Sequence, residues 1–256
     1  MTNGTFTPHP GAAPLGRQVL AQARMEATLM ARNGEQLLIA MVVPLLVLAV
    51  GLIASHRLGL DFGGRSTIDV LTPGVLALGV MSTAFTSLAI ATGFERRYGI
   101  IKRLGASPLP RHGLLMGKVL ALLLVQVCQL AVLGAVALAL GWSPQVHLVG
   151  FLLTMVLGIA AFAALGLFIA GVLRAEATLA VANLVYLVLV AGGGVVVPAS
   201  YYGSAAQLVT WLPSGALGES MRASLGSGTV DWAALLVLSL WATACAALTV
   251  RTFRWE

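Results

Sequence analysis

Residues Leu148–Leu173 read LVGFLLTMVLGIAAFAALGLFIAGVL, and no charged side chain interrupts them. A helix rises about 1.5 Å per residue, so a bilayer core of about 30 Å needs roughly 20 consecutive apolar residues. The stretch exceeds that length. A lone segment in lipid must satisfy its own backbone hydrogen bonds, and a helix does so. These residues therefore predict a membrane-spanning helix.

The remainder of the chain has the same apolar character. Of its 256 residues, 59% are hydrophobic and 9% are charged, whereas soluble domains carry about 25% charged residues. We therefore expect an all-α membrane protein whose residues 35–256 form a domain with six transmembrane helices. The expected spans are Leu37–Ser55, Leu71–Thr92, Leu114–Leu140, Leu148–Leu173, Thr178–Val197 and Trp232–Val250.

The basic residues predict how these spans are oriented. The net charge of +6 could indicate nucleic-acid binding in a soluble protein, but here the basic residues gather in short loops. Cytoplasmic loops of membrane proteins are rich in Lys and Arg. With both termini in the cytoplasm, the outside holds Arg57, Arg65 and Arg222. The cytoplasmic side then holds Arg17, Arg24, Arg32, Arg96, Arg97, Lys102, Arg103, Arg111, Lys118, Arg174, Arg251 and Arg254. We expect a multi-pass protein of the cytoplasmic (inner) membrane without a nucleic-acid partner, and the composition is typical of a bacterial protein.

Three segments are expected to lie outside the spans. Residues 1–14 predict a disordered cytoplasmic tail, because they are rich in Pro, Gly and Thr. Residues 15–34 predict an amphipathic helix in the membrane interface, with Leu15, Val19, Ala23, Ala27 and Met30 on its apolar face and Arg17, Arg24, Glu26 and Arg32 on other faces. A soluble helix packed on another domain is the alternative. Residues 198–230 predict short re-entrant external helices before the last span, since they are apolar but broken by Pro and Gly.

Enzyme signatures are absent from the sequence. The run Gly113–Lys118 has too few residues between its glycines for a phosphate loop, and Val119 replaces the required Ser or Thr. The four histidines are scattered, so we expect no catalytic, cofactor or metal site on this chain. An ion-coupled transporter would need a carboxylate inside a span, and none is seen. The energy for any transport is therefore expected to come from a partner.

The loop between the second and third spans predicts a docking element. Phe94, Tyr98, Ile101 and Leu104 share one face of a short helix over about 94–105, and charged residues occupy the other faces. We expect Pro108 and Pro110 to end this helix. Such an amphipathic helix suits a soluble partner, and the alternative is a basic anchor that only fixes topology.

The run Glu95-Arg-Arg-Tyr-Gly99 through Pro108-Leu109 to Gly117-Lys118 resembles the signature of type-2 ABC exporter permeases. This family includes daunorubicin-resistance and polysaccharide-export permeases. Trp211-Leu-Pro213 followed by Glu219 and Arg222 is similar to the segment that precedes the family's last span. The external segment is short, so a large external module is not implied.

The resemblance implies a permease subunit that exports a drug, lipid or glycolipid, and that works with a second permease chain, identical or homologous. Two soluble ABC ATPase subunits would bind ATP and magnesium. It also implies that the interfacial helix contacts the ATPase, and that the ATPase-coupling residues are Glu95, Arg96, Arg97, Tyr98, Gly99, Ile101, Lys102, Arg103 and Leu104.

Small residues add a mechanical expectation. Gly166 and Ala170 lie one helical turn apart and would let helices approach closely. A gate or hinge is expected at Gly192, Gly193, Gly194 and Pro198, in the last half of the fifth span, and simple close packing is the alternative. A membrane scaffold or regulatory subunit, and an ion-coupled secondary transporter, remain the competing functions.

Overall fold

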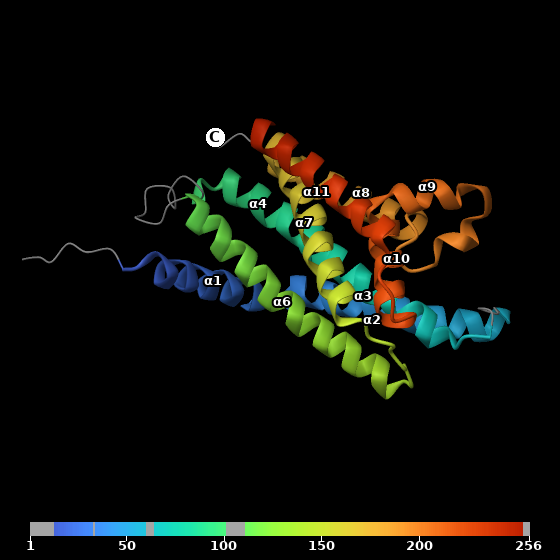
Figure 1. Cartoon of the computed structure of the whole chain (residues 1–256). Coiled ribbons are helices and arrows are strands. Elements are labelled where there is room, and N and C mark those ends of the chain that lie inside the picture. The colour runs from blue at the N-terminus through green and yellow to red at the C-terminus, as the bar shows by residue number, and fades with distance from the viewer. Residues whose placement is uncertain (1–12, 33, 60–63, 101–110, 253–256) are drawn as a thin grey trace, which may run out of the picture.

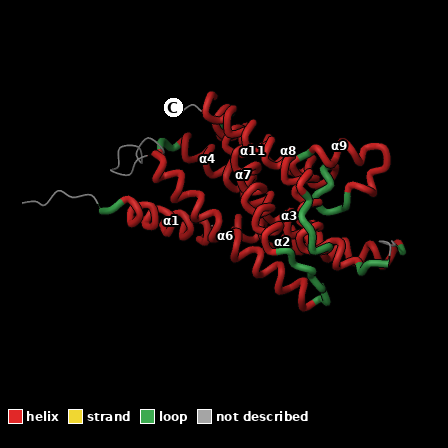
Figure 2. The backbone as a smooth tube through the Cα atoms, in the orientation of Figure 1, coloured by secondary structure: helices red, strands yellow, loops and turns green. Residues whose placement is uncertain are grey.

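The computed structural model describes residues 13–32, 34–59, 64–100 and 111–252. Every regular element in these ranges is a helix (Figures 1 and 2). The elements in chain order are α1 (Leu15–Arg32), α2 (Gly34–Leu58), α3 (Thr67–Met81), the π-helix η1 (Ser82–Ser87), α4 (Leu88–Arg97), α6 (Arg111–Ala139), α7 (Leu148–Val172), α8 (Ala175–Gly192), the 3₁₀-helix η2 (Ala199–Ala205), α9 (Ala206–Trp211), α10 (Pro213–Gly226) and α11 (Trp232–Thr252).

The six expected spans are confirmed in number and order. Helices long and apolar enough to cross a bilayer cover Ala40–Arg57, Thr67–Arg97, Met116–Ala139, Leu148–Val172, Ala175–Gly192 and Trp232–Thr252. The fifth span differs from expectation, because α8 ends at Gly192 and the backbone up to Pro198 is not helical.

The second span lies at the centre of the bundle. It consists of α3, η1 and α4, and 83% of its apolar 18-residue window is buried inside the protein, against 22–39% of the corresponding windows of the other spans. Its middle turn, Ser82–Ser87, is π-helical. At this level α7 crosses it, and a Cβ atom added to Gly166 would lie 2.8 Å from the Phe85 carbonyl oxygen. The close approach expected at Gly166 is therefore confirmed.

The spans alternate between two ends of the bundle, which we call the Glu95 end and the Asp69 end. At the Glu95 end lie α1, the end of α4, the start of α6 and the α7–α8 turn, which ion pairs and hydrogen bonds connect. The Asp69 end holds the α6–α7 loop, where the Ser143 N–H donates to Asp69, and the short helices η2, α9 and α10. The short helices expected before the last span are thus present (Figure 1).

Helix α1 covers Leu15–Arg32, within the expected range of residues 15–34, and packs along α6. A Cβ atom on Gly117 of α6 would lie 2.6 Å from Gln22 Cγ, so the glycine allows this contact. The packed face differs from the expected one, since it buries Gln22 and Glu26 beside Val19 and Ala23. Glu26 was expected on a face away from the apolar stripe, and the structure corrects this.

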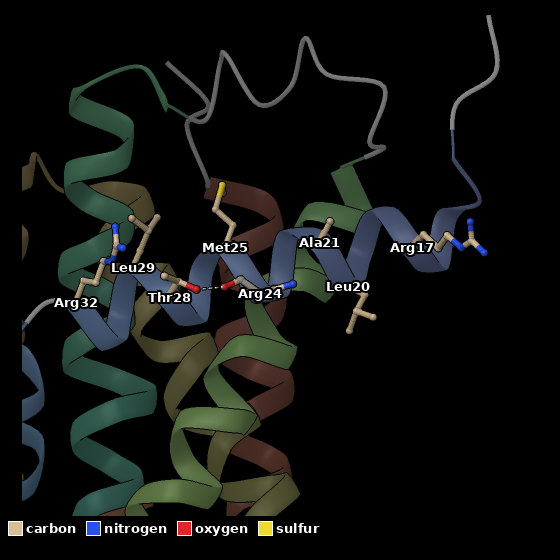
Figure 3. Close-up of a pocket in the computed structure, with 8 residues that line it drawn as sticks. All are labelled: Arg17, Leu20, Ala21, Arg24, Met25, Thr28, Leu29 and Arg32. Atoms are coloured by element: carbon tan, nitrogen blue, oxygen red, sulfur yellow. Dashed lines mark hydrogen bonds between the residues drawn. The ribbon is translucent and has the colours of Figure 1, made fainter. Parts of the chain in front are cut away.

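The opposite face of α1 bears a shallow groove of about 630 Å³ that mixes arginines with exposed apolar side chains (Figure 3). Arg17, Arg24 and Arg32 lie beside Leu20, Met25 and Leu29. The helix is therefore amphipathic in an unusual sense, because its inner face carries a carboxylate and its outer face carries bulky apolar groups. Its place at a membrane surface stays a prediction.

Candidate functional site

A charged cluster of Gln22, Glu26, Glu95 and Lys118 joins three helices at the Glu95 end. Lys118 Nζ on α6 lies 2.7 Å from Glu95 Oε1 on α4, and 3.2 Å and 3.3 Å from the two carboxylate oxygens of Glu26 on α1. Gln22 Nε2 donates to Glu26 Oε1 at 2.9 Å. One ammonium group thus serves two carboxylates that are distant in sequence.

The cluster is largely shielded from solvent. The side chains of Lys118, Glu95 and Glu26 are 20%, 19% and 11% exposed. Charges withdrawn from water must recover their lost hydration from close partners, and removal of one partner leaves the other uncompensated. Movement of α4 relative to α1 or α6 would therefore break a contact whose loss costs free energy. The cluster thus holds the three helix ends together.

Glu95 occupies a different position in its helix from the expected one. Phe94–Arg97 form the last turn of α4, so the expected separate helix does not begin at Phe94. A carboxylate at a helix C-terminus is disfavoured by the helix dipole, whereas the expected helix over about 94–105 would have placed Glu95 at a favourable N-terminus. Lys118 offsets this cost, because its ammonium group bonds the carboxylate directly.

Arg96 and Arg97 tie the same turn to the junction of α7 and α8. Arg96 Nη1 donates to the carbonyl oxygens of Ala170 and Leu173, at the end of α7, where a cation is favoured by the helix dipole. Arg97 pairs with Glu176 in the first turn of α8. The latter side chains are 50% and 63% exposed, so this pair contributes little to stability.

After this turn the chain bends at Tyr98 and Gly99. The Tyr98 N–H donates to the Phe94 carbonyl, and the Phe94 and Tyr98 rings stack at 6.2 Å. Gly99 has a φ of +65°, a conformation in which glycine commonly terminates helices. Ile101, Lys102, Arg103 and Leu104 lie outside the described residues. The coupling role of the whole set stays a prediction.

The expected gate residues lie at the opposite end. Gly192 is the last residue of α8, Gly193 caps it, Gly194 has a φ of +69°, and Pro198 precedes η2. They therefore lie at the end of the fifth span, and their role as a gate or hinge stays a prediction.

Glu26, Lys118 and Gln22 were not among the residues expected to form a site. The only signal was the Gly-Lys pair at the entrance of α6. Within the described ranges, no three His, Cys, Asp or Glu side chains lie close enough to hold a metal ion.

A family model described as "ABC-2 type transporter" matches residues 15–224, which include the charged cluster and most of α10. The chain belongs to the ABC-2 type transporter family. This family consists of membrane transport subunits that typically work with ABC ATPase partners. This ABC-2 type transporter is accordingly a multi-pass membrane protein.

A related protein supports the same conclusion. The chain is 26% identical over 163 residues to the "Putative transport permease YvfS" of Bacillus subtilis (strain 168). The alignment covers 62% of this ABC-2 type transporter and 66% of the relative.

Proposed function

We propose that this ABC-2 type transporter is the membrane subunit of an ATP-driven exporter, and that its ATPase partner docks on the loop between α4 and α6. The observation that supports this proposal is the charged cluster. Lys118 lies on α6, after that loop, and pairs with Glu95 at the end of α4, before the loop. It also pairs with Glu26 on α1. A partner that displaced the loop would therefore move three helices together rather than one.

Force would reach the rest of the bundle through the neighbouring contacts. Arg96 connects the end of α4 to the end of α7. The continuous segment α3–η1–α4 then runs from the Glu95 end to the Asp69 end. Closure of the ATPases on ATP is the type of domain movement that such contacts transmit.

The distribution of charge supports the orientation. Among the described residues, Arg57, Arg65 and Arg222 lie at the Asp69 end, and the other Lys and Arg residues lie at the Glu95 end. This bias favours a cytoplasmic Glu95 end. Both termini then lie in the cytoplasm. The protein itself lies in the inner membrane of a bacterial cell.

The complex would contain two ATPase subunits and a second permease chain, identical or homologous. ATP and magnesium would bind to the ATPases rather than to this chain. The proposed substrate class is a hydrophobic or amphipathic compound, namely a drug, lipid or glycolipid, as the resemblance to exporter permeases implies.

The test uses the tagged full chain, purified in mild detergent from the cells that produce it naturally and reconstituted in liposomes. We expect a soluble protein with a phosphate-loop motif to co-purify, and the complex to hydrolyse ATP. ATP should drive movement of a fluorescent phospholipid or a lipophilic dye, the two probes of the substrate class. Glu95→Gln should lower ATP-driven movement about tenfold without loss of the ATPase.

Glu176→Gln is the matched control, because it neutralises an exposed carboxylate at the same end of the bundle. Equal activities of Glu95→Gln and Glu176→Gln would contradict the role of the cluster. Probe movement driven by an ion gradient without ATP would contradict the exporter assignment itself. A purified chain that binds no ATPase and moves no probe would instead favour a scaffold or regulatory subunit.

A further inference from the structure

The backbone that follows α8 needs hydrogen-bond donors from elsewhere in the protein. Residues 193–197 are not helical, so their carbonyl groups lack the partners that a continuing helix would supply. Irregular backbone beside a membrane span is tolerated only where the protein or a water-filled cavity satisfies it.

Arg222 on α10 supplies most of these donors. Its Nη2 donates to the Gly194 carbonyl at 2.9 Å, and its Nη1 donates to the carbonyls of Val195 and Val196 at 3.1 Å and 3.3 Å. The residue is 9% exposed. The planar guanidinium group, with five N–H donors, can serve several acceptors at once, which a lysine ammonium group on the same stem cannot match.

Glu219, one turn earlier on α10, completes the arrangement. Its Oε1 accepts from Arg222 Nη2 at 3.0 Å, and also from the backbone N–H of Ala199 at 2.7 Å. Its Oε2 accepts from Arg222 Nε at 3.3 Å. This Arg222–Glu219 clamp therefore holds both ends of the segment, the carbonyls of 194–196 and the amide of 199.

The segment is also enclosed by backbone on two sides. A Cβ atom added to Gly74 of α3, or to Gly218 of α10, would lie 2.6 Å from the Val195 carbonyl oxygen. The Ser214 hydroxyl donates to the Gly193 carbonyl at 2.9 Å. The segment thus lies close to α3 and α10 and is bonded to α10.

We infer that Arg222 is a positioning residue for transport. Together with Glu219, it fixes the broken end of the fifth span to α10, so that this end and α10 move as one body. Gly192–Gly194 then do not act as a free hinge while the clamp is formed. The functional part of this inference rests on the proposed export activity, whereas its structural part does not.

The clamp can be tested by hydrogen–deuterium exchange on the full chain in nanodiscs. We expect Arg222→Gln to raise the exchange rate of amides within 193–199 at least tenfold, while α7 and α11 keep their protection. Arg222→Lys should give an intermediate rate, because one ammonium group replaces part of the contacts. The matched control is Arg65→Gln, since Arg65 also donates to a carbonyl of α10, that of Gly226.

Transport is measured on the reconstituted complex as probe moved per ATP hydrolysed. Arg222→Gln should lower this ratio at least fivefold with the ATPase still bound, and Arg222→Lys should partly restore it. Unchanged exchange in Arg222→Gln would refute the clamp, and raised exchange with an unchanged ratio would refute the positioning role. If the wild-type complex moves no probe, the proposed function fails, yet the exchange result still decides the structural part. If Arg222→Gln does not fold, Arg222→Lys against Arg65→Gln gives the same decision.

Discussion

Replacement of Lys118 by methionine leaves the carboxylates of Glu95 and Glu26 without the ammonium group that lies between them. Breaking a buried ion pair by removal of one partner costs about 3–5 kcal/mol. The three side chains are 11–20% exposed rather than fully buried, so we expect a value near the lower limit, about 3 kcal/mol. Glu95→Gln should cost less, about 1–2 kcal/mol, because Lys118 keeps its contacts to Glu26.

The double variant of Glu95 and Lys118 separates the interaction energy of this pair from the effects of each residue on its other neighbours. Without Glu95, the loss of Lys118 strands one carboxylate instead of two, so the two costs do not add. We expect a coupling energy of about 1–2 kcal/mol between Glu95 and Lys118. The same cycle on Arg97 and Glu176, an exposed pair at the same end, should give about 0.2–1 kcal/mol.

The assay is denaturant unfolding of the four variants of each cycle in mixed micelles, followed by circular dichroism. Coupling between Glu95 and Lys118 that is no larger than that between Arg97 and Glu176 would refute the reasoning. It would mean that the cluster behaves as a surface ion pair despite its burial.

Three further predictions concern topology, activity and packing. A single cysteine at Ser66 and another at Ser107 should be labelled by an impermeant reagent from opposite sides, and labelling from the same side would contradict the six-span arrangement. The purified chain without its partner should hydrolyse no ATP, and turnover that persists after removal of contaminating ATPases would contradict this. Gly166→Val should destabilise the protein by about 1–3 kcal/mol, because its side chain would meet the Phe85 backbone carbonyl. Gly134→Val, with open space around it, is the control in the same unfolding assay.

Hydropathy predicted the spans well because the bilayer imposes one simple requirement, an apolar helix of sufficient length. It placed the fifth helix end incorrectly for a related reason. The residues Val195–Val197 are as apolar as the helix before them, so the run gave no sign of an end. The backbone can leave the helix there because Arg222, more than twenty residues later, satisfies the freed carbonyls. A local pattern carries no information about such a contact.

The charged cluster could not be predicted from the sequence for a comparable reason. Glu26 and Lys118 are separated by 92 positions, and Glu95 and Lys118 by 23. Glu26 was placed on a polar face of its helix and Glu95 in the expected coupling element, but neither residue was connected to Lys118. The helical periodicity of residues 15–32 placed Glu26 on a polar face. This periodicity could not reveal that a cation on α6 lies against the face of α1 that is buried. Resemblance to a family did single out Glu95 and the Gly-Lys pair, but it did not join them.

The π-helix Ser82–Ser87 determines the angular phase of the second span. A π turn holds about one residue more than an α turn, so it rotates everything after it by about 100° relative to an uninterrupted α-helix. Deletion of one residue in this turn would remove the extra residue, so the segment after it would keep nearly the same angular position on a regular α-helix. Conversion of the turn to α-helix at unchanged length would instead rotate Glu95 away from Lys118, although neither residue lies in the turn. Substitutions in this turn that favour the α-helix would therefore act on the loop end of α4 as a rotation, without any change of a side chain there.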